Sequence, residues 1–267
     1  MSFFERLFIS SAVKNKRLIL RMTKREIISR YKGSMLGIFW SLLNPLIMLT
    51  VYTFVFGVVF NAKWGVDSGE NFSVVLFTGL ILHAFLAETV ALAPSTILSN
   101  VNYVKKVVFP IEVLAFIYLS SSFFNFVIGL GLVFIAQILF GTGVSLTWLY
   151  LPLIILPMIF LCLTVLWFFS SLGVYIRDLR QVTPIMATLL LFLCPIFYPL
   201  SAMPESFQKV ILLNPLSYIV EQAREILIFG NSPNILNLSL YTLTTIVLAQ
   251  IAYSFFMRTK KGFADVL

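Results

Sequence analysis

The chain has 267 residues, of which 60% are hydrophobic and only 11% are charged, and its formal net charge is +8. Soluble domains carry roughly 25% charged residues, so this composition excludes an ordinary soluble globular protein. In a soluble protein a basic excess would suggest nucleic acid. Beside long apolar runs it indicates attraction to anionic membrane lipid instead, and we expect no nucleic-acid partner.

Residues 1–35 are expected to form a cytoplasmic amphipathic segment at the membrane interface. On a helical projection of about 100° per residue, five basic residues share one sector. These residues are Arg17, Arg21, Lys24, Arg25 and Lys32. Arg30 and Ile28 depart from the pattern. A helix of this kind lies along the inner leaflet with its basic face toward the lipid headgroups.

Six apolar runs are long enough to cross a bilayer, which takes about 20 mostly apolar residues. They comprise residues 36–60, 72–93, 113–140, 148–176, 181–200 and 238–257. Prolines interrupt several of them, and proline-kinked helices occur in bundles with and without a central passage. The runs predict an all-α integral membrane protein with six transmembrane helices, and they leave no room for a separate soluble domain.

The positions of Lys and Arg predict how these spans are oriented. If the N-terminus is cytoplasmic, sixteen of the nineteen Lys and Arg residues fall on the inner face. Only Lys63, Lys209 and Arg224 then fall on the outer face. Because loops rich in Lys and Arg resist translocation, this distribution predicts that both termini are cytoplasmic.

The stretch 201–237 predicts two short helices that enter the outer face of the membrane without crossing it. The first is expected to begin at Pro204-Glu205. The second takes Asn214 as its cap and Pro215 as its first residue, and it ends at Gly230-Asn231. It covers only about 21 Å, which is short of a hydrocarbon core of about 30 Å. The pair is therefore expected to be re-entrant or interfacial.

The sequence contains no catalytic or nucleotide-binding motif. GxxxxGK[ST], HExxH and CxxC are all absent, so we expect no enzyme activity, no metal site and no cofactor in this chain. Cys162 and Cys194 fall within apolar runs and are expected to be small buried hydrophobes. The intramembrane residues His83 and Glu88 favour structural hydrogen bonds between helices over a proton relay.

Two further features permit more than one interpretation. The stretch 94–110 carries Lys105 and Lys106 between two prolines, and its composition alone favours an ordinary surface loop over a short helix. The chain also holds 27 Phe, 10 Tyr and 4 Trp residues. Rings on the proline-bearing spans could line a passage and stack on sugar rings, although packing is the commoner role. The candidate lining residues are Trp40, Tyr52, Phe56, Phe197 and Tyr198.

The order of these segments resembles the permease subunits of bacterial ABC exporters for cell-surface polysaccharides, the type-two ABC family that includes the Wzm-like O-antigen export permeases. The resemblance covers essentially the whole chain. Its most specific match is residues 24–45, and residues 104–110, Arg177-Asp178 and residues 213–217 support it.

The resemblance implies a homodimer of six-span subunits in the bacterial cytoplasmic (inner) membrane, paired with two ATP-binding cassette subunits that hold the ATP and Mg. The implied cargo is an undecaprenyl-linked polysaccharide of the O-antigen type. The alternatives are teichoic acid, capsule, lipid or drug.

The resemblance also assigns roles to particular residues. Residues 98–108 match the segment that couples the permease to its ATPase, and the outer hairpin matches a gate at the exit. The implied coupling residues are Ser99, Asn100, Tyr103, Lys105 and Lys106; Arg177 and Asp178 brace the second inner loop; Glu221, Arg224 and Glu225 order the outer gate.

Two other classes of protein fit the sequence less well. A membrane-embedded transferase for lipid-linked sugars would need clustered carboxylates or histidines near an interface, and the sequence has none. A channel or secondary transporter is disfavoured by the near-absence of intramembrane charge and of matching broken helices in the two halves.

Overall fold

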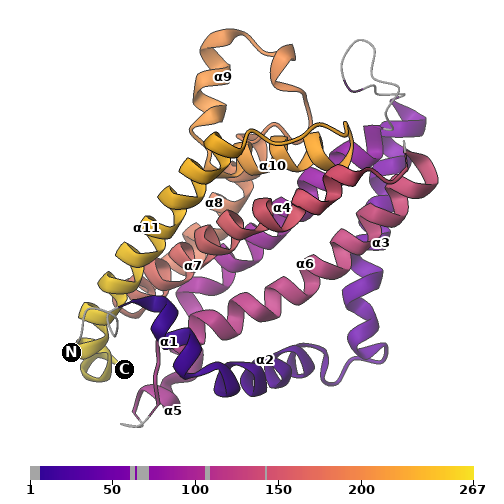
Figure 1. The fold of residues 1–267 in the computed structure, drawn as a ribbon. Coiled ribbons are helices and arrows are strands. Elements are labelled where there is room, and N and C mark those ends of the chain that lie inside the picture. The colour runs from indigo at the N-terminus through magenta and orange to yellow at the C-terminus, as the bar shows by residue number, and fades with distance from the viewer. Residues whose placement is uncertain (1–6, 61–63, 65–71, 106–108, 142) are drawn as a thin grey trace.

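A computed structural model of the chain describes residues 7–60, 64, 72–105, 109–141 and 143–267. Every regular element in these ranges is helical, which confirms the predicted all-α fold. The long helices form a tilted bundle, which α2 (Lys16–Tyr31) crosses at one end (Figure 1). A hairpin of α9 (Glu205–Leu212) and α10 (Pro215–Leu227) lies at the other end. These are called the basic end and the hairpin end.

Five helical segments are long and apolar enough to cross a membrane, and they correspond to five of the six predicted runs. They are Gly37–Val59, Phe72–Ser95, Val113–Phe140, Leu146–Tyr175 and Ile235–Val266. Their main helices are α3 (Trp40–Tyr52) with the π-helical continuation η3 (Thr53–Val59), α4 (Phe72–Leu92), α6 (Val113–Phe140), α7 (Leu151–Tyr175) and α11 (Ile235–Thr259). Short 3-10 turns flank or join the helices at Gly37–Phe39, Ala93–Ser95, Leu98–Asn100, Leu146–Tyr150, Leu200–Ala202 and Lys260–Gly262.

The sixth predicted run, residues 181–200, is helical only in its first part. Helix α8 (Leu179–Phe192) has only 14 residues, which is about 21 Å. Residues 193–199 are not helical. Pro195 and Pro199 explain the break, because proline lacks an N–H group and disfavours helical geometry in the residue before it.

The hairpin follows the capping signals in the sequence. The Asn214 side chain accepts a hydrogen bond of 2.9 Å from the Leu216 N–H, and Pro215 is the first residue of α10. Gly230, which follows α10, has a positive φ of 69°. Both predicted helices and their boundary at Asn214-Pro215 are therefore confirmed. Helix α10 packs across α4 and α7 at the hairpin end (Figure 1).

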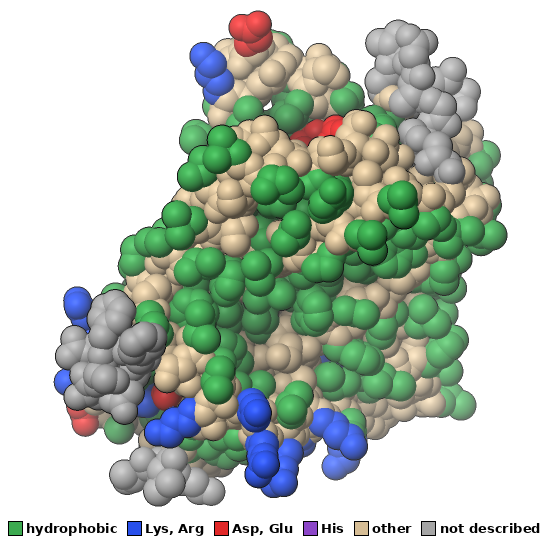
Figure 2. Space-filling model, in the orientation of Figure 1, with side chains coloured by type: hydrophobic (Ala, Val, Ile, Leu, Met, Phe, Trp, Pro, Cys, Tyr) green, Lys and Arg blue, Asp and Glu red, His purple; other side chains and the backbone are tan. Residues whose placement is uncertain are grey.

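The N-terminal segment is helical, as predicted, and is divided by Asn15 into α1 (Phe8–Lys14) and α2. Helix α2 has no fully buried residue and rests against α6. Figure 2 shows hydrophobic side chains over the middle of the visible face, with Lys and Arg side chains gathered beneath them at the basic end. This distribution is the one expected of a bundle whose middle lies in lipid.

The C-terminus folds back at the basic end in a way that the sequence did not predict. After α11, the short helix α12 (Phe263–Val266) buries Phe263 completely against Phe256 and Tyr175. Lys260 Nζ lies 2.7 Å from Glu112 Oε2 at the start of α6. Helices α1 and α12 consequently lie at the same end of the bundle (Figure 1).

Burial is uneven among the long helices. Helix α4 is central, with 72% of its apolar window buried, whereas none of the corresponding window of α3 is buried. Helix α3 therefore contacts the bundle along one side and presents its other side outward.

Candidate functional site

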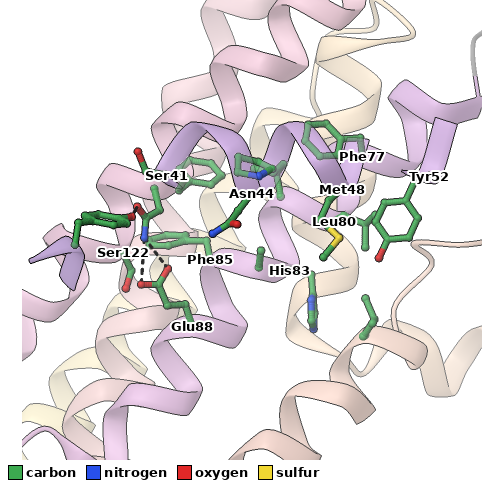
Figure 3. Close-up of a pocket in the computed structure, with 17 residues that line it drawn as sticks. Ser41, Asn44, Met48, Tyr52, Phe77, Leu80, His83, Phe85, Glu88 and Ser122 are labelled. Atoms are coloured by element: carbon green, nitrogen blue, oxygen red, sulfur yellow. Dashed lines mark hydrogen bonds between the residues drawn. The ribbon is translucent and has the colours of Figure 1, made fainter. Parts of the chain in front are cut away.

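A cavity of about 380 Å³ lies between α3, α4 and α6, with the end of α2 and part of α8 completing its wall (Figure 3). Apolar and aromatic side chains form most of its surface. Its polar lining residues are Tyr31, Ser41, Asn44, Tyr52, His83, Glu88, Ser122 and Asn125. Mostly apolar walls with a few convergent polar groups are typical of small-molecule sites.

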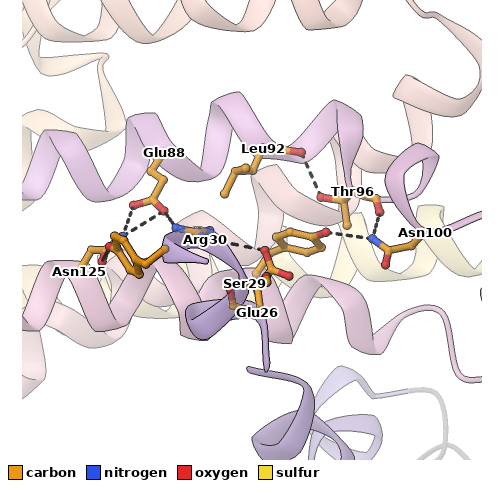
Figure 4. A network of polar contacts seen from close by, with 10 residues as sticks. Glu26, Ser29, Arg30, Glu88, Leu92, Thr96, Asn100 and Asn125 are labelled. Atoms are coloured by element: carbon orange, nitrogen blue, oxygen red, sulfur yellow. Dashed lines mark hydrogen bonds and ion pairs between the residues drawn. The ribbon is translucent and has the colours of Figure 1, made fainter. Parts of the chain in front are cut away.

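Glu88 is held in a network that joins three helices (Figure 4). Its carboxylate forms an ion pair with Arg30 of α2. Asn125 of α6 donates to both Glu88 oxygens at 3.4 Å, and the Tyr31 hydroxyl donates to Asn125 Oδ1 at 3.0 Å. The structural role predicted for Glu88 is confirmed. Its cationic partner was missed, since Arg30 is the residue that departs from the basic sector of α2.

His83 also forms the interhelical hydrogen bond that the sequence predicts. Its Nε2 lies 2.9 Å from the Ala187 carbonyl oxygen. Because a carbonyl can only accept, Nε2–H is the donor. The bond joins the central helix α4 to the short helix α8.

The loop after α4 is helical, which corrects the expectation that composition alone favoured. Leu98–Asn100 and α5 (Val101–Val104) together form about two turns at the basic end. We call residues 98–104 the connecting segment. Ser99 on this segment and Lys105 after it are exposed, and Lys106 lies outside the described residues. The exposed side chains are accessible to a partner protein.

The connecting segment is tied to the bundle on two sides. Arg25 of α2 donates to the Tyr103 hydroxyl at 2.8 Å. Asn100 Nδ2 donates to the Tyr118 hydroxyl of α6 at 2.9 Å and to the Thr96 carbonyl oxygen at 2.8 Å. Asn100 and Tyr103, two of the predicted coupling residues, therefore fix the segment to α6 and to α2.

The chain just before the connecting segment, at Pro94, is also in backbone contact with α7. A Cβ added to Gly173 would lie 2.3 Å from the Pro94 carbonyl oxygen. We expect Gly173→Ala to force the two backbones apart and to lower the free energy of unfolding by about 1–3 kcal/mol, the usual cost of overpacking. Thermal unfolding of the purified protein in detergent measures this effect.

Gly131→Ala is the matched control for that substitution, because nothing lies within 4 Å of a Cβ added there. Equal melting temperatures of the two variants would show that the contact between α7 and the loop is not tight.

Arg177 and Asp178 follow α7 at the basic end. Both are exposed. Within the part of the chain that the structure describes, neither side chain forms a hydrogen bond or an ion pair. Their role as a brace of the second inner loop stays a prediction.

The structure brings together three of the five aromatic candidates. The ring of Phe56 lies 6.3 Å from that of Tyr52 and 6.3 Å from that of Phe197. Tyr198 donates its hydroxyl to the Phe192 carbonyl oxygen at 2.7 Å. Trp40 lies twelve positions before Tyr52 on the same span, about 18 Å along the helix, and is separate from this group. Whether these rings face a passage stays a prediction.

Arg224, which the sequence assigns to the outer face, is buried, with only 1% of its surface exposed. Its Nε donates to the Val75 carbonyl oxygen at 3.2 Å and its Nη2 to that of Ile196 at 2.9 Å. Its Nη1 donates to the Pro195 carbonyl oxygen. The broken end of α8 leaves the carbonyls of Pro195 and Ile196 without helical partners, whereas Val75 lies within α4. The five donors of a guanidinium can bond several carbonyls at once.

Two further groups surround the Arg224 side chain. Glu221 Oε1 lies 3.2 Å from Nη1, and the guanidinium carbon lies 4.2 Å from the centre of the Trp64 ring. Burial lowers the pKa of Arg224 to about 10, against the opposing effect of Glu221, so the side chain remains charged at neutral pH. Burial raises the pKa of the Glu221 carboxyl, and Arg224 opposes that shift.

The third predicted gate residue, Glu225, lies apart from this cluster. Its carboxylate accepts a hydrogen bond of 2.6 Å from Asn231 Nδ2, beyond the end of α10. Glu225 therefore binds the loop that follows α10, whereas Arg224 fixes α10 to α4 and to the residues after α8. The gating role of all three residues stays a prediction.

Comparison with known proteins agrees with this architecture. The sequence profile of the ABC-2 type transporter family matches residues 17–228. The chain is 28% identical over 251 residues to an O-antigen export system permease protein RfbA of Klebsiella pneumoniae, covering 94% of this chain and 95% of the relative. It is 26% identical over 250 residues to RfbA of Myxococcus xanthus, with coverage of 93% and 94%. It is 25% identical over 236 residues to the polysialic acid transport protein KpsM of Escherichia coli, with coverage of 86% and 89%.

The family match spans most of the helices described above, from α2 to the end of α10. The five apolar helices and the relatives agree on a protein that crosses the membrane several times. The resemblance found in the sequence is thereby confirmed, and the chain belongs to the ABC-2 type transporter family.

Proposed function

We propose that this chain is the permease subunit of an ATP-driven exporter that moves lipid-linked polysaccharide of the O-antigen type across the bacterial cytoplasmic membrane. The alignment of more than nine-tenths of the chain with O-antigen export permeases carries the proposal. Because the sequence has no phosphate-binding loop, ATP hydrolysis is assigned to a separate partner.

We propose six crossings with both termini in the cytoplasm. The sixth consists of α8 completed by the non-helical residues 193–199. Non-helical backbone is tolerated at membrane depth when it is buried in protein and its polar groups are bonded, and Arg224 bonds two of these carbonyls. An even number of crossings agrees with α1 and α12 at the same end (Figure 1), and the basic residues at that end favour the cytoplasm.

We propose that two copies pair across α3 and α8 to form the conduit. Large apolar side chains on α3, on its continuation η3 and on α8 are exposed in the single chain. They include Leu46, Ile47, Val51, Phe54, Ile185, Leu189 and Phe192. Between the two copies, the rings of Tyr52, Phe56 and Phe197 would stack on the apolar faces of sugar rings and guide the polymer.

The connecting segment is the proposed contact with the ATP-binding subunits. Reversing the charges after it, with Lys105→Glu and Lys106→Glu together, is expected to reduce polymer display at the cell surface at least tenfold. The protein should stay folded because Lys105 is exposed. Surface display, ATPase stimulation and thermal unfolding are measured on the same variant.

Lys209→Glu on α9, at the hairpin end, is the control for a reversed exposed charge. Normal display and normal ATPase stimulation in the double variant would remove the connecting segment from the coupling path.

The proposed function is tested by deleting the gene and restoring it. Loss of one surface polysaccharide on deletion, its return on complementation, and co-purification of this chain with an ATP-binding protein are the expected results. Unchanged surface polysaccharide after deletion would overturn the proposal. The relatives named as polysialic acid transport proteins support a polysaccharide of the polysialic acid type as a second candidate cargo, and the chemical identity of the missing polymer decides between the two.

A further inference from the structure

The cavity between α3, α4 and α6 contains hydrogen-bonding groups that the protein itself leaves unused. Ser122 is completely buried, and its Oγ has no hydrogen-bond partner in the described structure. The Glu88 carboxylate that lines the cavity is paired with Arg30, which is not itself a lining residue. Asn44 is an exposed residue whose amide points into the same space (Figure 3) and forms no hydrogen bond within the described ranges. An unpartnered buried polar group such as the Ser122 hydroxyl is uncommon and indicates a ligand or water.

Aromatic rings form much of the remaining wall. Tyr52, Phe77, Phe85 and Phe126 line the cavity from α3, α4 and α6. An acyl chain would suit these rings but would leave the Ser122 hydroxyl unpaired in apolar surroundings, which is costly. A pyranose ring suits both parts of the wall, since it has apolar C–H faces and hydroxyls that donate and accept hydrogen bonds.

The charges around the cavity further restrict the chemical class of ligand that it can bind. Glu88 carries the one carboxylate among the described lining residues, and it is already paired with Arg30, which also lies 3.8 Å from Glu26. An anion would meet the Glu88 carboxylate, and a cation would have to compete with Arg30 for it, so a neutral polyhydroxylated ligand fits best. A volume of about 380 Å³ is near the lower limit of small-molecule sites, roughly 300–1,000 Å³. It fits one or two sugar rings rather than a polymer segment.

The cavity opens toward the proposed conduit. Met48 lines it and is 52% exposed, which places the mouth beside the outward face of α3. Leu191 of α8 lines the same side. Tyr52 belongs both to the cavity wall and to the group of rings with Phe56. We propose that this cavity is a side pocket of the conduit that binds a neutral sugar residue of the passing polymer, an inference that rests on the proposed function.

The test uses the full chain, purified without its ATPase partner, in lipid nanodiscs. Saturation-transfer NMR measures binding of the methyl glycosides of glucose, galactose and mannose at millimolar concentration. The expected result is transfer to the sugar ring protons that falls about fivefold or more in Asn44→Leu and in Ser122→Ala, each of which removes one hydrogen-bonding group. Asn237→Leu, at an exposed position of α11, should bind like the unchanged protein.

Equal transfer in Asn44→Leu and the unchanged protein, or no transfer from any glycoside, would overturn the side pocket. Binding of 1-octanol that the glycosides do not displace would also overturn it, because it would identify an acyl-chain site. The assay needs neither ATP nor polymer. Absence of glycoside binding would therefore overturn the side pocket without contradicting the export function. If complementation failed while the glycosides still bound, the export function would be overturned and the binding would need another explanation.

Discussion

Replacing Arg224 by methionine is expected to lower the free energy of unfolding by about 3–5 kcal/mol, the range measured when one partner of a buried ion pair is removed. The substitution leaves the carbonyls of Val75, Pro195 and Ile196 without their donor. It also leaves Glu221 partly buried without its cation. Methionine fills a similar volume, so the lost hydrogen bonds and charge dominate the effect.

The measurement is unfolding of the purified protein in mixed micelles with increasing SDS, followed by tryptophan fluorescence. Lys209→Met removes an exposed basic residue from the same hairpin and should change stability by less than about 0.5 kcal/mol. If both variants unfold at the same SDS fraction, Arg224 does not hold the broken end of α8.

Gly79→Val approaches the same contact from α4. A Cβ at position 79 would lie 3.0 Å from Arg224 Nη2 and 3.3 Å from Ile196 Cγ1. Valine adds two methyl groups at this point, so it should displace the guanidinium and destabilise the protein by about 1–3 kcal/mol. The same unfolding experiment measures it. A variant as stable as the unchanged protein would mean that Arg224 has room to move.

Arg30→Glu is expected to reduce polymer export at least tenfold, because it places a third carboxylate beside Glu26 and Glu88 where α2 meets α4. The ion pair with Glu88 is the charged link between these two helices. Arg25, on the same helix, holds the connecting segment through Tyr103. Loss of the Arg30 contact should therefore prevent movement of the connecting segment from being transmitted through α2 to the cavity wall on α4.

The charge swap Arg30→Glu with Glu88→Arg tests this link directly. It should restore part of the export that either single reversal removes, with a coupling energy of about 0.5–3 kcal/mol in a double-mutant cycle of stability. Arg21→Glu, in the exposed sector of α2, controls for reversal of charge on this helix. A swap no better than the single reversals would show that the ion pair is not the connection.

The hairpin at residues 205–227 was predictable because its signals are local. Asn214 and Pro215 act within one turn of the chain, through a side-chain cap and a fixed φ. The apolar runs were predictable for a similar reason, since the length of a span depends on its own residues and on the thickness of the bilayer. The break in α8 was the exception. Pro195 was visible in the sequence, but the donor that stabilises the broken backbone comes from position 224.

The candidate site shows the same division. His83 and Glu88 were recognised as structural residues because ionisable groups inside a span need partners. Their partners, Ala187 and Arg30, lie 104 and 58 positions away, at separations where no periodic pattern applies. The helical projection of α2 placed Arg30 outside the basic sector and gave no sign of its role, because a projection relates a residue only to others on the same helix and not to those on a neighbouring helix.

The sequence by itself determined the class of protein, the positions of the apolar helices, the hairpin and its caps, and the concentration of basic residues at one end. These depend on hydropathy, spacing and capping, which act over a few turns of chain. Tertiary structure decided where the two critical arginines point. Nothing in the sequence distinguishes Arg30 and Arg224 from exposed basic residues. Only the packing of the helices brings Arg30 to the Glu88 carboxylate of α4, and Arg224 to carbonyl groups of α4 and of the residues after α8.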